Sequence, residues 1–202
     1  MSLTFRLATP TDASQLQPLV QSAYRGDSSR AGWTTEADLL GGERIDVDGI
    51  ISKIARPNAA VIIATDPDGI LTACCEVERK GTERAYFGMF AVDPKRQAGG
   101  FGRQVLQYAE EWCAREWGTK KMEMSVIWTR AELIAWYERR GYKKTGETRA
   151  FPWEELGEQG WALRGKEELD LYFEVLEKEI GDGEKGKSEV VVGQVEVAAV
   201  AA

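Results

Sequence analysis

The chain has 202 residues, of which 43% are hydrophobic and 29% charged, a balance typical of a soluble globular domain that can bury a core. It contains no histidine, which excludes Ser-His-Asp and Cys-His catalysis and every histidine-ligated metal or haem site. The net charge of −7, from 26 Lys+Arg against 33 Asp+Glu, disfavours a nucleic-acid partner and weakly favours a cationic or amine-bearing substrate.

The first third of the chain predicts one strand and three helices. Apolar residues three and four positions apart between Leu16 and Tyr24 indicate an amphipathic helix, which Pro18 should kink. Thr34 and Asp48 are good N-caps for the two helices that follow. The predicted elements are a strand at Thr4–Ala8, a helix from Thr11 to Tyr24, a loop at Gly26–Ser29, a helix from Thr34 to Leu40 and a helix at Gly49–Arg56.

Three β-rich runs separated by short polar turns follow. The first run is continuously apolar, which favours a strand buried on both faces, and the turn after it contains proline and glycine. Strands joined by tight turns form an antiparallel meander. The predicted strands are Ala59–Thr65, Ile70–Arg79 and Arg84–Val92.

From Phe101 the apolar period changes to 3.6 and predicts a helix that ends near Gly118. Thr129 and Glu132 have the spacing of a capping box, which would open a second helix that Gly141 stops. We expect one domain over residues 1–180 and a mobile tail at 181–202. The predicted elements are a helix at Phe101–Trp117, a strand at Lys121–Trp128, a helix at Arg130–Arg140, and strands at Lys143–Phe151 and Leu169–Glu177.

The cysteines and the two ends of the chain indicate the expected cellular compartment. Cys74, Cys75 and Cys113 lack metal-ligand spacing and are interpreted as reduced structural thiols, which favours a reducing compartment. Met1–Pro10 lacks the apolar run of a signal peptide, and the longest apolar tract, Val190–Ala202, is too short to span a bilayer. The sequence therefore predicts a cytoplasmic protein with no membrane partner and no metal.

The segment from Met89 to Arg103 carries the most chemical information. A predicted strand ends at Val92, and a turn with Gly99, Gly100 and Gly102 leads directly into a helix. Glycines let an anionic group approach the main chain, and the first amides of a helix lack intrahelical partners at the positive end of the dipole. The pattern suits a pyrophosphate cradle, although the same glycines also fit a plain strand-to-helix turn.

Val92-Asp93-Pro94 followed by Gln97-x-x-Gly100-x-Gly102 resembles the acyl-CoA-binding motif of the GNAT superfamily of N-acetyltransferases. The order of the predicted elements agrees over roughly residues 3–178. The resemblance implies an α+β fold with a central, mostly antiparallel mixed sheet of six to seven strands flanked by about four helices. The stretch Tyr24–Glu36 also resembles a subgroup of small, stand-alone microbial members, which does not identify an acceptor.

The resemblance implies that acetyl-CoA is the co-substrate. Main-chain groups at the end of the meander would bind the pantetheine arm, and the amides of the glycine-rich turn would bind the pyrophosphate. Arg130 stands about where many family members have an asparagine that faces the cofactor, which puts that polar contact in doubt. The implied cofactor-binding residues are Phe90, Ala91, Val92, Gln97, Ala98, Gly99, Gly100, Gly102, Arg103, Arg130 and Tyr137.

A second stretch, Ala135–Tyr142, resembles the family's penultimate helix with its pattern Tyr-x-x-x-Gly-Tyr/Phe. The resemblance implies that Tyr137 lies near the CoA sulfur and protonates the departing thiolate. A phenol keeps its proton at neutral pH and can therefore donate it, although Tyr137 would also suit packing on the inner helix face.

The acceptor side is less determined. Without histidine, a carboxylate acting through water is the natural base, and Glu36 is the first candidate, with Glu76 and Glu78 as second choices. Each of them could equally be a solvated carboxylate, and Glu36 could simply favour a helix N-terminus. Tyr24 and Trp33, with Glu36, are the expected substrate-binding residues, and Trp153 and Trp161 lie in a long loop that could form a lid.

Three functions remain open at this stage. The first is transfer of an acetyl group from acetyl-CoA by direct attack of a primary amine on a small molecule, such as a polyamine, an amino sugar or an amino-acid derivative. The second is acetylation of a protein or peptide amine, and the third is a non-catalytic acyl-CoA-binding module. Formation of a homodimer is also left open.

Overall fold

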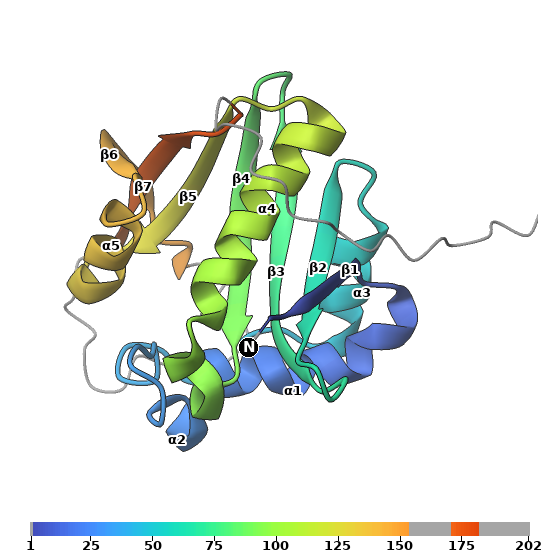
Figure 1. Cartoon of the computed structure of the whole chain (residues 1–202). Coiled ribbons are helices and arrows are strands. Elements are labelled where there is room, and N and C mark those ends of the chain that lie inside the picture. The colour runs from blue at the N-terminus through green and yellow to red at the C-terminus, as the bar shows by residue number, and fades with distance from the viewer. Residues whose placement is uncertain (1, 154–170, 182–202) are drawn as a thin grey trace, which may run out of the picture.

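The computed structural model describes residues 2–153 and 171–181, which form a seven-stranded sheet in the order β1-β2-β3-β4-β5-β7-β6 (Figure 1). Only β4 and β5 run parallel in it, which confirms the mixed, mostly antiparallel sheet. The strands are β1 (Thr4–Leu7), β2 (Ala59–Thr65), β3 (Leu71–Lys80), β4 (Arg84–Val92), β5 (Lys121–Ile127), β6 (Lys143–Ala150) and β7 (Tyr172–Glu179).

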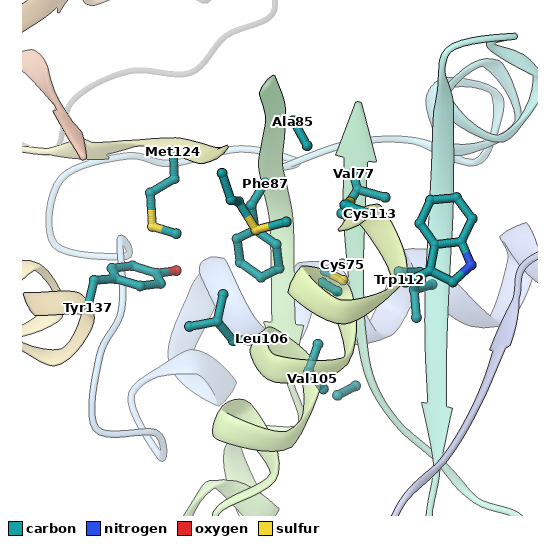
Figure 2. Packing of buried hydrophobic residues seen from close by; sticks show 14 of the residues in the cluster. Cys75, Val77, Ala85, Phe87, Val105, Leu106, Trp112, Cys113, Met124 and Tyr137 are labelled. Atoms are coloured by element: carbon teal, nitrogen blue, oxygen red, sulfur yellow. The ribbon is translucent and has the colours of Figure 1, made fainter. Parts of the chain in front are cut away.

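Helices cover both faces of the sheet (Figure 1). On one face, Val105 and Leu106 of α4 pack with Phe87 of β4 in one apolar cluster (Figure 2). On the other face, Leu16 of α1 and Ile50 of α3 belong to a second cluster. The helices are η1 (Pro10–Asp12), α1 (Ala13–Tyr24), α2 (Gly26–Ser29), α3 (Val47–Ala55), η2 (Pro94–Gly99), α4 (Phe101–Trp117) and α5 (Ala131–Glu138).

The sheet opens between β4 and β5. The two strands pair over only three residues, Arg84–Tyr86 with Lys121–Glu123, and then diverge (Figure 1). A bulge at Met89, whose φ is +43°, accompanies the divergence. Because of it, Phe87 faces the α4 side, whereas Met89 and Ala91 face α1 and α3. The opening brings the C-terminal half of β4 to the surface of the site described below.

Four local predictions about the helices are wrong. No helix forms between Thr34 and Leu40, because tertiary contacts engage the residues expected to start one, and a short helix, α2, replaces the predicted loop after Tyr24. The cap of α3 is Asp46, whose carboxylate accepts from the amide of Gly49 at 2.7 Å, instead of Asp48. Thr129 does not cap α5, since its buried hydroxyl has no partner in the described part of the chain.

The three cysteines are buried and free, as predicted. Burial raises the pKa of the Cys74 thiol to about 12, so it stays protonated as a core group. Residues 154–170, with Trp161, and the tail at 182–202 lie outside the described residues. Within the described ranges, no helix is long and apolar enough to cross a membrane.

Candidate active site

Two cavities meet where β4 leaves β5. The first, of about 110 Å³, lies beside the Gln97–Gly102 segment and is called the motif cavity. The second, of about 320 Å³, lies against β4 and β5 and is called the strand cavity. The residues that line both are Tyr24, Phe90, Arg130, Leu133 and Tyr137.

The glycine-rich turn forms one wall of the motif cavity. Gly100 has φ +72° and ψ 12°, a left-handed conformation that glycine adopts without strain, and it directs the chain from η2 into α4. A Cβ on Gly102 would lie 3.2 Å from the Phe90 ring and 3.5 Å from Trp136. The first turn of α4, with its unpaired amides, therefore lies close against the cavity.

Gln97 holds the loop after α2 against this turn. Its side-chain oxygen accepts from the amide of Trp33 at 3.0 Å, and its side-chain nitrogen donates to the carbonyl of Val92 at 3.3 Å. Trp33, 44% exposed, stacks on Trp136 with ring centroids 6.3 Å apart. The side chain of Gln97 thus shapes the cavity by positioning its aromatic rim.

Arg103 and Arg140 line one end of the motif cavity, and Arg139 lines a neighbouring pocket with them. None forms an ion pair with another described residue, and Arg140 lies 3.4 Å over the ring of Trp136. Burial, followed by the charges of Arg139 and Arg103, lowers the pKa of Arg140. Like charges this close favour an anion between them. Arg96, by contrast, is neutralised by Asp66 and Asp93, so it adds no free charge to the rim.

Tyr137 lies at the junction of the two cavities. Its side chain is 4% exposed, and its hydroxyl points away from α5 toward Phe87 (Figure 2). No hydrogen bond to a described residue occupies this hydroxyl. Burial, followed by the nearby Tyr24, raises its pKa well above the usual range, so the phenol remains protonated at every physiological pH.

Tyr24 lies at the same junction, but its hydroxyl already forms a hydrogen bond within the protein. Its hydroxyl donates to the main-chain carbonyl of Phe90 at 2.8 Å, and burial raises its pKa to about 12. The carbonyls of Phe90 and Val92 are therefore both occupied by side chains.

The structure does not support Glu36 as the base. Its carboxylate is 7% exposed and pairs with Arg25 at 2.5 Å and Arg130 at 2.7 Å. Burial raises the pKa of Glu36, but the charges of Arg130 and Arg25 outweigh burial and lower it. A carboxylate held ionised by two guanidinium groups binds a further proton poorly, so Glu36 has a structural role in the wall between the cavities.

The second-choice bases, Glu76 and Glu78, also form ion pairs. Glu76 is buried and pairs with Lys53 at 2.5 Å, and Glu78 pairs with Lys80 at 2.7 Å. Neither lines the two cavities. Among the described residues, no group of three or more His, Cys, Asp or Glu side chains is placed to hold a metal ion.

Most of the predicted site residues come together. Ala91 lies in the core below α1, and neither it nor Gly99 lines either cavity; Ala98 belongs to η2. Glu36 lines only the strand cavity. The predicted residues that line the motif cavity are Tyr24, Trp33, Phe90, Val92, Gln97, Gly100, Gly102, Arg103, Arg130 and Tyr137.

Sequence reasoning missed Trp136, Arg140, Arg44 and Arg149, which also line the cavities. Trp136 and Arg140 stand next to Tyr137 in the helix that resembles the family pattern, so that pattern could have indicated them. Nothing local marks Arg44 or Arg149, since only the fold brings them to β4.

Comparison with known proteins agrees with this geometry. Residues 57–144 match the family model of the acetyltransferase (GNAT) domain. S-(2-succino)cysteine N-acetyltransferase of Bacillus subtilis (strain 168) is 31% identical over 155 residues, which cover 73% of this chain and 88% of that protein. The chain belongs to the GNAT superfamily. This GNAT protein is an acyltransferase.

A second relative and two solved structures extend the comparison. S-alkylcysteine N-acetyltransferase of the same bacterium is 29% identical to this GNAT protein, over 69% of this chain and 78% of its own. The ribosomal-protein-S18-alanine N-acetyltransferase of Escherichia coli superposes with a TM-score of 0.64 at 15% identity, covering 93% of this chain and all of the other. Spermidine/spermine N-acetyltransferase of Vibrio cholerae superposes with a TM-score of 0.60 at 14% identity, over 88% and 92% of the two chains. At such identities these two structures show the shared fold alone.

Proposed function

We propose that the protein transfers an acetyl group from acetyl-CoA to a primary amine of a small molecule. The observation that carries the proposal is the junction of two cavities at Tyr137: the motif cavity would admit the donor, and the strand cavity would admit the acceptor. Direct transfer needs both molecules at one point, since positioning supplies much of the rate.

The residues of the motif cavity fit acetyl-CoA. The N-terminus of the helix that follows Gly100 and the side chains of Arg103 and Arg140, which have no carboxylate partner among the described residues, suit its phosphates. Gly102 packs closely against Phe90 and Trp136 in the cavity wall, and the open sheet would let a narrow chain beside β4 reach Tyr137. When bound, acetyl-CoA supplies a thioester whose carbonyl carbon accepts the amine nitrogen and whose sulfur leaves.

Tyr137 is the proposed acid. Its hydroxyl holds a proton that no described neighbour accepts, and Tyr137 lines both cavities, at whose junction we expect the sulfur to leave. Donation from Oη would convert the leaving thiolate to a thiol, and the resulting phenolate would regain a proton from solvent. The new N–C bond replaces the C–S bond, so atoms and charge balance.

The proton of the amine needs an acceptor as well. Glu36, the only carboxylate of the described lining, is held ionised by Arg25 and Arg130. We therefore propose that the amine loses its proton to water before or during attack, without a carboxylate of the described lining as base.

The names of the two Bacillus relatives point to an S-substituted cysteine as the first acceptor class to test. S-Methylcysteine is a simple probe of that class. Acetylation of a peptide amine remains the alternative, and a cytoplasmic location and a homodimer remain predictions.

The proposal is tested by titrating the purified chain with acetyl-CoA in a calorimeter and by following free-thiol release with a panel of small amines. We expect binding at one site and thiol release that depends on the amine, with the acetylated amine identified by mass spectrometry. Acetyl-CoA binding without transfer to any amine of the panel would favour the non-catalytic module. Transfer to peptides alone would favour the peptide alternative.

A further inference from the structure

The strand cavity has the opposite charge to the whole molecule. The net charge of the chain is −7, yet the described lining of this cavity carries three arginines, Arg44, Arg130 and Arg149, against one carboxylate, Glu36. The weak preference for a cationic acceptor, which the net charge suggests, therefore does not hold locally.

The three arginines differ in their partners. Arg130 donates to Glu36 at 2.7 Å and to the hydroxyl of Thr34 at 2.9 Å. Arg149 donates to Glu123 and, at 3.0 Å, to Ser125. Both are thus paired with a carboxylate and a hydroxyl of the protein, although the buried Nε of Arg130 has no hydrogen-bond partner among the described residues.

Arg44 has no such hydrogen-bonded partner, although its charge, like those of Arg130 and Arg25, lowers the pKa of Glu36. Within the described part of the chain its guanidinium has no carboxylate in ion-pair distance and makes no hydrogen bond, and it lies 5.1 Å from the ring centroid of Tyr24. Its main chain is anchored, since its amide donates to the side chain of Gln21 at 2.8 Å. A half-buried guanidinium in a cavity, with a fixed backbone and free N–H groups, is equipped to bind a carboxylate.

We propose that Arg44 binds a carboxylate of the acceptor, so that the acceptor is an amino acid or a close derivative of one. Tyr24 lies between the two sites that such a molecule would occupy. The guanidinium of Arg44 stacks on the Tyr24 ring, and Tyr24 also lines the junction of the cavities beside Tyr137. A carboxylate held at Arg44 leaves an amine on a neighbouring carbon near that junction. This inference rests on the proposed function and assigns to Arg44 the recognition of the carboxylate that an S-substituted cysteine would carry.

The experiment compares S-methylcysteine with S-methylcysteamine, which is the same molecule without its carboxylate. We expect the wild-type chain to prefer S-methylcysteine in kcat/KM, and Arg44→Gln to raise the KM of S-methylcysteine about 10- to 100-fold. The KM of S-methylcysteamine should not change in that variant, and Arg44→Lys should restore part of the preference. The matched control, Arg115→Gln, removes an exposed positive charge from α4 outside both cavities and should change neither KM.

Four results would overturn the inference. Equal turnover of the two amines by the wild-type chain would do so without any variant. An equal loss for both amines in Arg44→Gln would show that Arg44 only supports the fold. Transfer to neither amine nor to any other amine of the panel would overturn the proposed function together with this inference, whereas transfer to carboxylate-free amines alone would overturn this inference only.

Discussion

The hydroxyl of Tyr137 combines three properties at one atom: it lies at the junction of two cavities, it has no hydrogen-bond partner among the described residues, and burial keeps it protonated. The neighbouring Tyr24 shares the first and third properties but donates to the carbonyl of Phe90. The hydroxyl proton that no described residue accepts is therefore that of Tyr137, and this difference supports Tyr137 over Tyr24 as the proposed acid.

Tyr137→Phe should lower kcat about 100-fold, because general acid catalysis by one side chain contributes on that order, and should leave the Kd of acetyl-CoA unchanged. Stopped thiol-release assays and calorimetry measure the two quantities. Tyr108→Phe is the matched control, since Tyr108 stacks on Phe5 outside both cavities. Unchanged kcat in Tyr137→Phe would remove this residue as the acid.

Glu36 makes a pH-dependent contribution to stability. Its pKa in the folded protein is below its ordinary value of 4.5, so the contribution is complete above that value and is lost as the pH falls through the folded pKa. Glu36→Gln should therefore lower the free energy of unfolding by about 3 kcal/mol at neutral pH and should flatten its fall in acid. Chemical denaturation from neutral to acidic pH measures the loss of stability and its pH dependence. Glu43→Gln, at an exposed carboxylate, is the control. An acid dependence that matches the wild type would contradict the role of the two arginines.

At the scale of elements, the turn from η2 into α4 depends on the left-handed conformation of Gly100. Gly100→Ala should cost about 1–2 kcal/mol of stability and should also weaken acetyl-CoA binding, because the first turn of α4 would be redirected. Gly81→Ala is the matched control: its φ is +71° against +72° for Gly100, and neither would place a Cβ within 4 Å of another group. Equal Kd values for the two variants would show that the turn does not position the cofactor.

The elements also show what the sequence could predict. Strands and the α4 helix follow from apolar periodicity and turn residues, and the motif at Gln97 was visible because its glycines are adjacent in the chain. The predicted helix after Thr34 failed for a tertiary reason: the hydroxyl of Thr34 accepts from Arg130, and Glu36 pairs with Arg25 and Arg130. No local pattern reveals that Arg130, which is 94 positions from Glu36 and 96 from Thr34, binds these two residues and so prevents Thr34 from capping a helix.

At the scale of the whole molecule, net charge and local charge disagree. Most of the described carboxylates around the site are paired with cations, as Glu36 is with Arg25 and Arg130 and Glu123 is with Arg149, so the acidic composition does not reach the strand cavity. The guanidinium of Arg44, in contrast, lines the strand cavity without a carboxylate in ion-pair distance among the described residues. The amino-acid composition therefore predicts the sign of the electrostatic field far from the molecule, but it does not predict the charge that the acceptor carries.

The pH dependence of the reaction tests the proposed proton path as a whole. There is no histidine, Tyr137 has a raised pKa and stays protonated, and Glu36 has a lowered pKa and stays ionised, so none of these groups titrates between about pH 6 and 8. The logarithm of kcat/KM should then rise with pH until the amine of the acceptor is deprotonated. Measured for two acceptors whose amines differ in pKa by about one unit, the inflection should shift with the acceptor. An inflection that stays fixed for both acceptors would instead reveal a base supplied by the enzyme.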